Sequence, residues 1–223
     1  MMIDNDNFYT SDEIMNSRQM PGVSNIRIFH AAPGAPEVDV YANGKKVANR
    51  LVYGQFTDYI SVSSGMYLIE AFPVGLKDSP ILSVRFPIVE GKVYTLSVIG
   101  VLPNIGILPV EDEYQNLSQN RVNIRFINLS PNAPGLDLAL RYGPNLFTDI
   151  HYTEASQYTP VLPGTYNMVV KPNQVDTIVV NLPNVRLLPK RNLTFYVLGM
   201  YGQQPSSLEV YIPMDGTTYL RDY

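Results

Sequence analysis

The side chains that could carry chemistry in this sequence are few and widely separated. It has two histidines, His30 and His151, and no cysteine. A mononuclear metal site needs histidines and carboxylates that converge at ligand spacing, and no such cluster is visible. Without cysteine there is no disulfide, no thiolate metal site and no cysteine nucleophile. Gly-x-Ser-x-Gly and glycine-rich phosphate loops are also absent. The sequence therefore predicts no enzyme activity, no metal and no cofactor.

Two aspartates are candidates for ligand binding, because they occupy equivalent positions in an internal repeat. Asp39 and Asp137 could each contact a sugar hydroxyl or a Ca²⁺ ion. Calcium prefers several clustered carboxylates, and each repeat offers one. The favoured interpretation is that both are solvent-facing strand residues that accept hydrogen bonds from the neighbouring proline-rich loop and protect a strand edge.

Tyrosines are the second candidate set, since the chain has 16 tyrosines and no tryptophan. A phenol combines a large apolar face with a polar tip, so grouped tyrosines could form a sugar-stacking or protein-binding platform. Carbohydrate platforms commonly use tryptophan, and its absence weighs against that reading. The tyrosines considered for a platform are Tyr41, Tyr53, Tyr59, Tyr152, Tyr158 and Tyr201.

Composition narrows the fold class and the possible partners. The chain has 223 residues, of which 45% are hydrophobic and 16% charged, with 18 prolines and 15 glycines. This mixture favours short strands joined by turns. The formal net charge is -4 and the basic residues are scattered, so nucleic acid is not an expected partner. The most apolar stretch, from Tyr94 to Val110, is interrupted by glycine and proline, which argues against membrane insertion.

The chain contains two copies of one segment. Asn25 to Val40 aligns with Asn123 to Leu138, and Thr95 to Gly100 aligns with Thr194 to Gly199. The expected organisation is an N-terminal arm over 1–22, a first repeat over 23–112, a linker over 113–120 and a second repeat with a C-terminal tail over 121–223.

Each repeat shows the signals of seven or eight short strands. Asn43-Gly44 between apolar strands predicts a type I′ hairpin, because both central residues of that turn need a positive φ. Alternation places Val38 and Val40 inward, and Leu136 and Leu138 repeat this arrangement. Comparison of the repeats assigns two equivalent sets to the core: Tyr67, Ile69 and Ala71, and Tyr166, Met168 and Val170. The predicted fold is all-β, with two tandem immunoglobulin-like β-sandwich domains.

These residues carry a resemblance to a known family. The run from His30 to Gly44, followed by Tyr53-Gly54 and by Ser64 to Tyr67, resembles the bacterial domain-of-unknown-function family 4397. The second repeat departs from the family pattern at Asn128, where a histidine is usual, and at 142–145, where the hairpin turn differs. The resemblance implies a β-sandwich found singly or in tandem in bacterial envelope and surface proteins, without an established activity.

The leading functional hypothesis is a non-enzymatic structural or adhesive protein of a bacterial surface assembly, such as a spore coat, appendage or envelope layer. The alternative is a carbohydrate-binding or small-ligand-binding module that acts as a soluble receptor. The N-terminal segment lacks an apolar signal-peptide core, so synthesis in the cytoplasm and deposition on the spore or cell surface are expected. The arm is the predicted assembly element, which would add to a strand edge of another copy or of another surface protein. Its apolar candidates are Ile3, Phe8, Tyr9, Ile14 and Met15.

Overall fold

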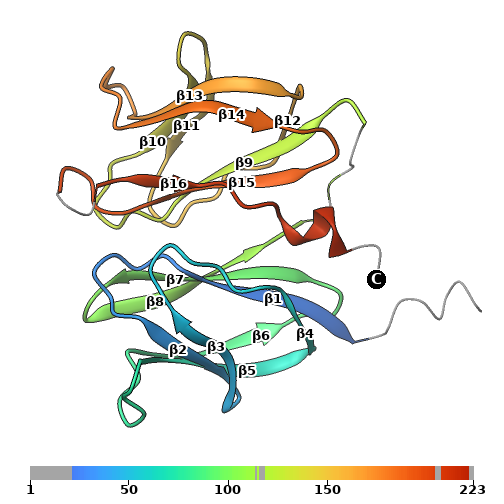
Figure 1. The fold of residues 1–223 in the computed structure, drawn as a ribbon, viewed down its shortest axis with the longest axis vertical. Helices are drawn as coiled ribbons and strands as arrows, with labels where there is room; N and C mark the ends of the chain where they lie inside the picture. Colours follow the sequence, from blue (N-terminus) through green and yellow to red (C-terminus); the bar gives the residue numbers. More distant parts are fainter. Residues whose placement is uncertain (1–21, 114, 116–118, 204–206, 221–223) are drawn as a thin grey trace, which may run out of the picture.

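The computed structural model describes residues 22–113, 115, 119–203 and 207–220. The chain forms two β-sandwiches stacked along the long axis of the molecule, and each sandwich consists of two four-stranded sheets (Figure 1). This architecture confirms the predicted all-β fold with two tandem immunoglobulin-like sandwiches.

The first sandwich contains the strands that precede residue 112. They are β1 (Val23–His30), β2 (Val38–Ala42), β3 (Lys45–Leu51), β4 (Ile60–Ser63), β5 (Gly65–Pro73), β6 (Leu82–Ile88), β7 (Val93–Val101) and β8 (Asn104–Glu111). One sheet has the order β4-β1-β7-β8 and the other has the order β3-β2-β5-β6.

The second sandwich repeats this plan. Its elements are β9 (Val122–Asn128), β10 (Leu136–Leu140), β11 (Asn145–Ile150), β12 (Thr159–Val161), β13 (Gly164–Pro172), β14 (Val180–Leu187), β15 (Asn192–Leu198), β16 (Glu209–Tyr211) and the 3₁₀ helix η1 (Gly216–Thr218). The sheet orders are β12-β9-β15-β16 and β11-β10-β13-β14, so every strand of one half has a counterpart in the other. In both halves the first strand pairs in parallel with the seventh, β1 with β7 and β9 with β15.

The predicted hairpin is present between β2 and β3. Asn43 has φ 47° and Gly44 has φ 75°, the two positive values that a type I′ turn requires. The Asn43 side chain also accepts a hydrogen bond from the Leu68 backbone N–H at 2.8 Å, which ties the turn to β5. In the second half β10 ends at Leu140 and β11 begins at Asn145, so this turn is longer, as the changed sequence suggested.

The predicted core faces are largely confirmed. Val38, Val40, Ile69 and Ala71 are fully buried in the first core. Leu136, Leu138, Met168 and Val170 are their buried counterparts in the second. Tyr67 and Tyr166 contact these cores but are only partly buried, because they lie near the exposed starts of β5 and β13, two residues after the first glycine of each strand.

The arm residues named as assembly candidates, Ile3, Phe8, Tyr9, Ile14 and Met15, lie outside the described residues. Within the described part of the chain, no helix has the length and apolar character needed to cross a membrane.

Candidate functional site

The two sandwiches meet through the sheets that contain β1 and β9 (Figure 1). Strands β7, β9 and β15 are buried along almost their whole length, because one face packs inside their own sandwich and the other packs against the opposite half. The junction cluster joins buried apolar side chains of both halves: Phe29, Ala31, Ile99, Val110, Ile127, Leu129, Tyr196 and Leu198. The ring of Phe29 stacks on Phe56 with centroids 3.7 Å apart, and Tyr196 of the other half packs edge-on against Phe29 at 5.2 Å.

A buried arginine of the first half crosses this junction. The Arg27 side chain projects from β1, and its Nε donates a hydrogen bond to Thr95 Oγ1 on β7 at 2.8 Å. Its Nη1 donates to the Met214 carbonyl of the second half at 3.1 Å, and its Nη2 lies 3.5 Å from the Asp215 carboxylate. The guanidinium carbon lies 4.7 Å from the centre of the Tyr59 ring, a cation–π distance.

Arg125 makes the same set of contacts in the opposite direction. Its Nε donates to Thr194 Oγ1 at 2.7 Å, within the second half. Its Nη1 donates to the Glu111 carbonyl at 2.7 Å, and its Nη2 donates to Asp112 Oδ1 at 2.7 Å, both in the first half. The guanidinium carbon lies 4.5 Å from the centre of the Tyr158 ring.

The two carboxylates are structurally equivalent. The backbone N–H of Asp112 donates to the Val93 carbonyl, and that of Asp215 donates to the Asn192 carbonyl at the matching position. Each carboxylate also accepts a hydrogen bond from a tyrosine of its own half, Asp112 from Tyr59 and Asp215 from Tyr158. The junction therefore has an approximate two-fold symmetry, in which each half supplies an arginine to the aspartate of the other.

Burial strongly affects the protonation of the arginines, tyrosines and Asp215 at the junction. It raises the pKa of the Asp215 carboxyl to about 6, and the neighbouring Asp112 charge adds to the rise while Arg125 and Arg27 oppose it. Burial also raises the pKa of the Tyr59 and Tyr158 hydroxyls, which keeps them protonated as hydrogen-bond donors. For both arginines, burial acts to lower the pKa, but the surrounding tyrosines and carboxylates outweigh it, so both pKa values are raised and both groups stay charged.

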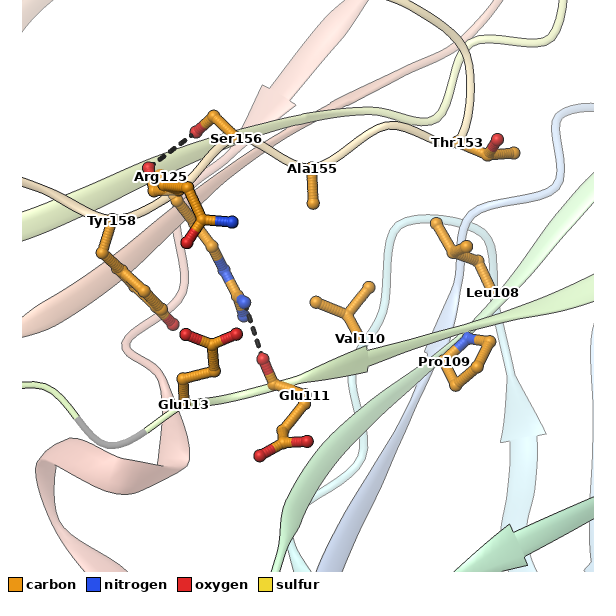
Figure 2. Close-up of a pocket in the computed structure, with 11 residues that line it drawn as sticks. Leu108, Pro109, Val110, Glu111, Glu113, Arg125, Thr153, Ala155, Ser156 and Tyr158 are labelled. Atoms are coloured by element: carbon orange, nitrogen blue, oxygen red, sulfur yellow. Dashed lines mark hydrogen bonds between the residues drawn. The ribbon is translucent and has the colours of Figure 1, made fainter.

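A small hollow of about 180 Å³ opens beside Arg125 at the edge of the junction. Figure 2 shows Arg125 next to this hollow, with its guanidinium directed at the Glu111 carbonyl. One wall is the end of β8, including Leu108 and Val110, and the other is the segment 153–158 of the second half. The Arg125 guanidinium is already used in hydrogen bonds to Thr194, Glu111 and Asp112. The hollow therefore lies beside the charged contacts of the junction and receives no free charge from them.

A sequence profile described as "Domain of unknown function (DUF4397)" matches residues 24–139. The chain belongs to this family. The match begins in β1, covers the whole first sandwich and continues past the junction into β10. It includes Arg27, Asp112 and Arg125 of the junction. A comparison of this DUF4397 chain with curated proteins found no match.

Three of the solved structures that are similar to the DUF4397 chain come from Eubacterium rectale and two Bacteroides species. One is CBMbc, a module of family CBM26 from Eubacterium rectale Amy13K in complex with maltoheptaose, at 11% identity and a TM-score of 0.28, with 86% of this chain and 99% of that chain covered. A leucine-rich repeat protein from Bacteroides thetaiotaomicron has 14% identity and a TM-score of 0.22, over 78% and 25% of the two chains. A candidate cell adhesion protein from Bacteroides eggerthii has 9% identity and a TM-score of 0.23, over 88% and 97%.

Four of the six candidate tyrosines of the DUF4397 chain lie at the junction. Tyr59 and Tyr158 donate to the buried aspartates, and Tyr53 and Tyr152 pack against the junction cluster. Two of them belong to each sandwich, and all four lie at the interface, so they contribute to the contact between the sandwiches.

The other two tyrosines lie elsewhere. Tyr41 lies on the outer face of β2, with its ring edge-on to Phe72 at 5.6 Å and the Lys46 ammonium 5.5 Å from its centre. Tyr201 packs against the core of the second sandwich. The structure therefore does not bring the six tyrosines together as one platform.

Asp39 holds the bulged hairpin of the first half. Its carboxylate accepts a 2.6 Å hydrogen bond from Lys46 Nζ and a 2.9 Å hydrogen bond from the backbone N–H of Arg50. Arg50 has φ 49°, so this acceptor stabilises a backbone conformation that side chains rarely adopt. The hydrogen bond from Lys46 is the main reason why the pKa of Asp39 is lowered.

Asp137 performs the same task at β10, but the expectation that it faces solvent is wrong. Only 3% of this residue is exposed, because Asn145 and Asn173 cover it. Its carboxylate accepts hydrogen bonds from Asn145 Nδ2 at 2.8 Å, Asn173 Nδ2 at 3.1 Å and the backbone N–H of Asp149 at 2.8 Å. Asp149 has φ 59°, the counterpart of the strained Arg50. Both aspartates thus accept hydrogen bonds from their hairpin, and Asp137 also accepts one from Asn173 after β13; the proline-rich loop supplies none of these donors.

The proline-rich loops are held by the residues at the ends of β1 and β9. His30 is buried, and its Nε2 lies 3.0 Å from the Pro36 carbonyl. Asn128 takes its place in the second half, where its Nδ2 donates to the carbonyls of Pro134 and Ile150. His151 is exposed and lies 3.3 Å from the Asp149 carboxylate. In the described residues, no group of three or more histidine, aspartate or glutamate side chains could hold a metal ion.

Sequence reasoning missed the charged members of the junction. Arg27 and Arg125 align in the repeat, and each stands between two apolar residues of its strand. That combination is a usable signal, because a charge kept in a buried strand needs a specific partner. Asp112 and Asp215 align only after a change of register in the repeat, since 98 residues separate the arginines and 103 separate the aspartates.

Proposed function

We propose that this chain is a non-enzymatic structural or adhesive protein of a bacterial surface assembly, such as a spore coat, an appendage or an envelope layer. In this role the two sandwiches act as one stiff unit. The observation that carries the proposal is the reciprocal pair of buried contacts at the junction, Arg125 with Asp112 and Arg27 with Asp215.

Buried charge pairs hold a junction in one geometry, because a small displacement leaves both charges poorly solvated, whereas full separation lets water reach them. Removing one partner from such a pair costs about 3–5 kcal/mol, since it leaves an uncompensated charge in a poorly solvated place. A hinge motion between the sandwiches would break two pairs at once. The buried arginines, aspartates and tyrosines of the junction hydrogen-bond to one another and to the backbone, which suits a rigid connection better than a site that must receive a substrate.

We also infer that the second sandwich is a second copy of the DUF4397 domain. The identical strand orders support this inference. So does the equivalence of Arg27 with Arg125 and of Thr95 with Thr194, whose hydrogen bonds agree to 0.1 Å.

Assembly through the N-terminal arm is the finer part of the proposal. The outer strands of each four-stranded sheet have an edge that no other strand of the sheet covers. An extended arm that adds to such an edge on another copy, or on a different surface protein, gains main-chain hydrogen bonds. The arm contributes Ile3, Phe8, Tyr9, Ile14 and Met15 as apolar anchors.

Electron microscopy of the purified chain and of the producing cells tests the proposal. Ordered polymers in the preparation, and immunogold label on the spore or cell surface, are the expected results. Deleting residues 1–20 should weaken the polymers and leave the melting temperature close to that of the full chain. A chain that stays in the cytoplasm and remains monomeric at high concentration would contradict the surface role.

Carbohydrate binding is the second candidate, and the outer face of β2 and β5 favours it. Tyr41 and Phe72 lie edge-on to each other there, beside Glu70 and Lys46, which is the mixture of aromatic and polar groups that sugars contact. A glycan array tests it, with Tyr41→Ala as the disabling variant. Tyr142→Ala is the matched control, because Tyr142 is 92% exposed on the other sandwich. Equal glycan signals for both variants would remove this face as the binding site.

A further inference from the structure

The junction has the symmetry of an interface between two copies of one protein. Arg27 of the first half contacts Met214 and Asp215 of the second, while Arg125 of the second contacts Glu111 and Asp112 of the first. When residue i contacts j and the equivalent of j contacts the equivalent of i, the interface is isologous. Most isologous interfaces join separate chains, whereas here one polypeptide provides both sides.

We propose that this junction is exchangeable, so that the first sandwich of one chain can dock on the second sandwich of another copy and link molecules into pairs or longer strings. The exchanged form repeats every contact of the closed form, including both Arg–Asp pairs and the Phe29–Tyr196 packing. Only the connection between Glu113 and Arg121 changes its path. Exchange of an identical element is therefore an economical route to association.

Concentration decides between the two forms. In the closed chain the second sandwich is tethered, which corresponds to an effective concentration in the mM range for a short linker. Free copies at a lower concentration cannot compete with it. A dense layer, in which copies are held close together, shifts the balance toward exchange without any new contact. The biological use of the exchange rests on the proposed assembly role, but the exchange itself depends only on the junction.

Unpaired polar atoms make opening of the junction less costly. The hydroxyl groups of Ser97 and Tyr196 occupy equivalent positions on β7 and β15, facing the junction, and both are buried without a hydrogen-bond partner among the described residues. A buried polar group that lacks a partner destabilises the closed junction, and this penalty is recovered when water reaches the group. The junction also relies on charge pairs, which resembles interfaces between domains more than a continuous core.

A cysteine trap in the full chain tests the exchange, because the natural sequence contains no cysteine. Thr217 Oγ1 lies 3.3 Å from the Glu113 carbonyl across the junction, so this pair marks two facing positions. Glu113→Cys is placed on one chain and Thr217→Cys on a second chain of different mass. Leu76→Cys, at a 59% exposed site remote from the junction, is the control for collisions. A chain with both Glu113→Cys and Thr217→Cys shows whether the positions can be bridged within one molecule.

We expect the Glu113→Cys and Thr217→Cys chains to cross-link at least tenfold more than the Thr217→Cys and Leu76→Cys chains, with a yield that rises with protein concentration. Equal yields for the two mixtures, when the doubly substituted chain closes on itself, would overturn the exchange. The result does not depend on whether the protein reaches a cell surface.

A charge-exchange experiment tests the exchange a second time, with substitutions that leave the connection between the sandwiches unchanged. Arg125→Asp leaves two aspartates facing each other in its own chain, and Asp112→Arg leaves two arginines. Only an exchanged pair of these two variants restores opposite charges at both junctions. Native mass spectrometry should show a 1:1 dimer in the mixture and monomers of each variant alone, and of a chain that carries both substitutions. The exchange would be ruled out if the mixture stays monomeric and the cysteine cross-link yields are at the control level. It would also be ruled out if the mixture stays monomeric and the chain with both cysteines fails to form its internal disulfide.

Discussion

Asp112 and Asp215 are equivalent carboxylates, and each accepts a hydrogen bond from a tyrosine of its own sandwich while it faces an arginine of the other sandwich. Their environments differ in the distance to the arginine. Asp112 lies 2.7 Å from Arg125, whereas Asp215 lies 3.5 Å from Arg27. The two Arg–Asp pairs of the junction are thus unequal in strength, and this difference can be measured.

Removing the arginines should destabilise the chain to different extents. Arg125→Met leaves Asp112 buried without its closest cation and should lower the free energy of unfolding by about 3 kcal/mol or more. Arg27→Met should lower it less, because the Arg27–Asp215 distance is longer and the Asp215 carboxyl can take up a proton. Chemical denaturation of the two variants measures the difference. An equal loss for both would mean that the asymmetry of the distances has no energetic meaning.

The charge of Asp215 should give the junction a pH dependence. Its pKa of about 6 in the folded chain lies above that of a free aspartate, so the folded state binds the proton more tightly than the unfolded state does. The stability that Asp215 contributes is therefore present at low pH and is lost as the pH rises through about 6. The melting temperature of the wild type, relative to Asp215→Asn, should be higher at about pH 4.5 than at about pH 7.5. A difference that is constant with pH would place the pKa of Asp215 near that of a free aspartate.

His30 and Asn128 should be interchangeable, because each holds the proline-rich loop of its own half. His30→Asn should change the free energy of unfolding by less than about 1 kcal/mol, whereas His30→Leu leaves the Pro36 carbonyl unpaired and should cost about 1–3 kcal/mol. Burial lowers the pKa of His30, so the unfolded chain binds the proton more tightly. The wild type should therefore lose stability relative to His30→Asn as the pH falls below about 6.5. Thermal melts of the three proteins at neutral and mildly acidic pH measure both effects.

The two hairpin aspartates should differ in importance. Asp137→Ala removes an acceptor from three donors in a covered place and should cost about 2–3 kcal/mol or more. Asp39→Ala should cost less, since the Asp39–Lys46 pair is near solvent and screened. Denaturation of both variants with and without Ca²⁺ is the measurement. A melting temperature of the wild type that rises with Ca²⁺, and no such rise in the variants, would favour a metal site at these aspartates instead.

Much of the fold follows from local signals in the sequence. Asn43-Gly44 determines a turn through backbone conformation alone, and alternation along β2 and β10 places Val38 and Leu136 in the cores. These predictions succeed because a tight turn or a pleated strand imposes its requirements on adjacent residues. The internal repeat adds to them, since it shows which positions stay apolar in both copies.

The junction could not be predicted in the same way, because it depends on two strands that are far apart in the sequence. Thr95 and Ser97 alternate with apolar residues in β7 and so look like the solvent face of a strand, yet both are fully buried by the opposite sandwich. Likewise, the sequence offers Tyr59 and Tyr158 as parts of a ligand platform, whereas their hydroxyls donate hydrogen bonds to carboxylates inside the junction. The alternation of side chains along a strand shows which face points away from its own core. It does not show that a second domain covers that face.

The parallel pairing of first and seventh strands has a further consequence for how the molecule can be tethered. β1 begins beside the start of β7, with Asn25 opposite Val93, and Asp112 ends the first sandwich at this same edge, where its N–H reaches the Val93 carbonyl. The 3₁₀ helix near the C-terminus also packs at Val93. The start of β1, the end of β8 and the 3₁₀ helix η1 therefore lie on one flank of the stack (Figure 1). A protein fused directly at Gly22 or at Leu220 would be attached on that flank, and the opposite flank, with its proline-rich loops, would remain free to face outward from any surface to which the molecule is anchored in this way.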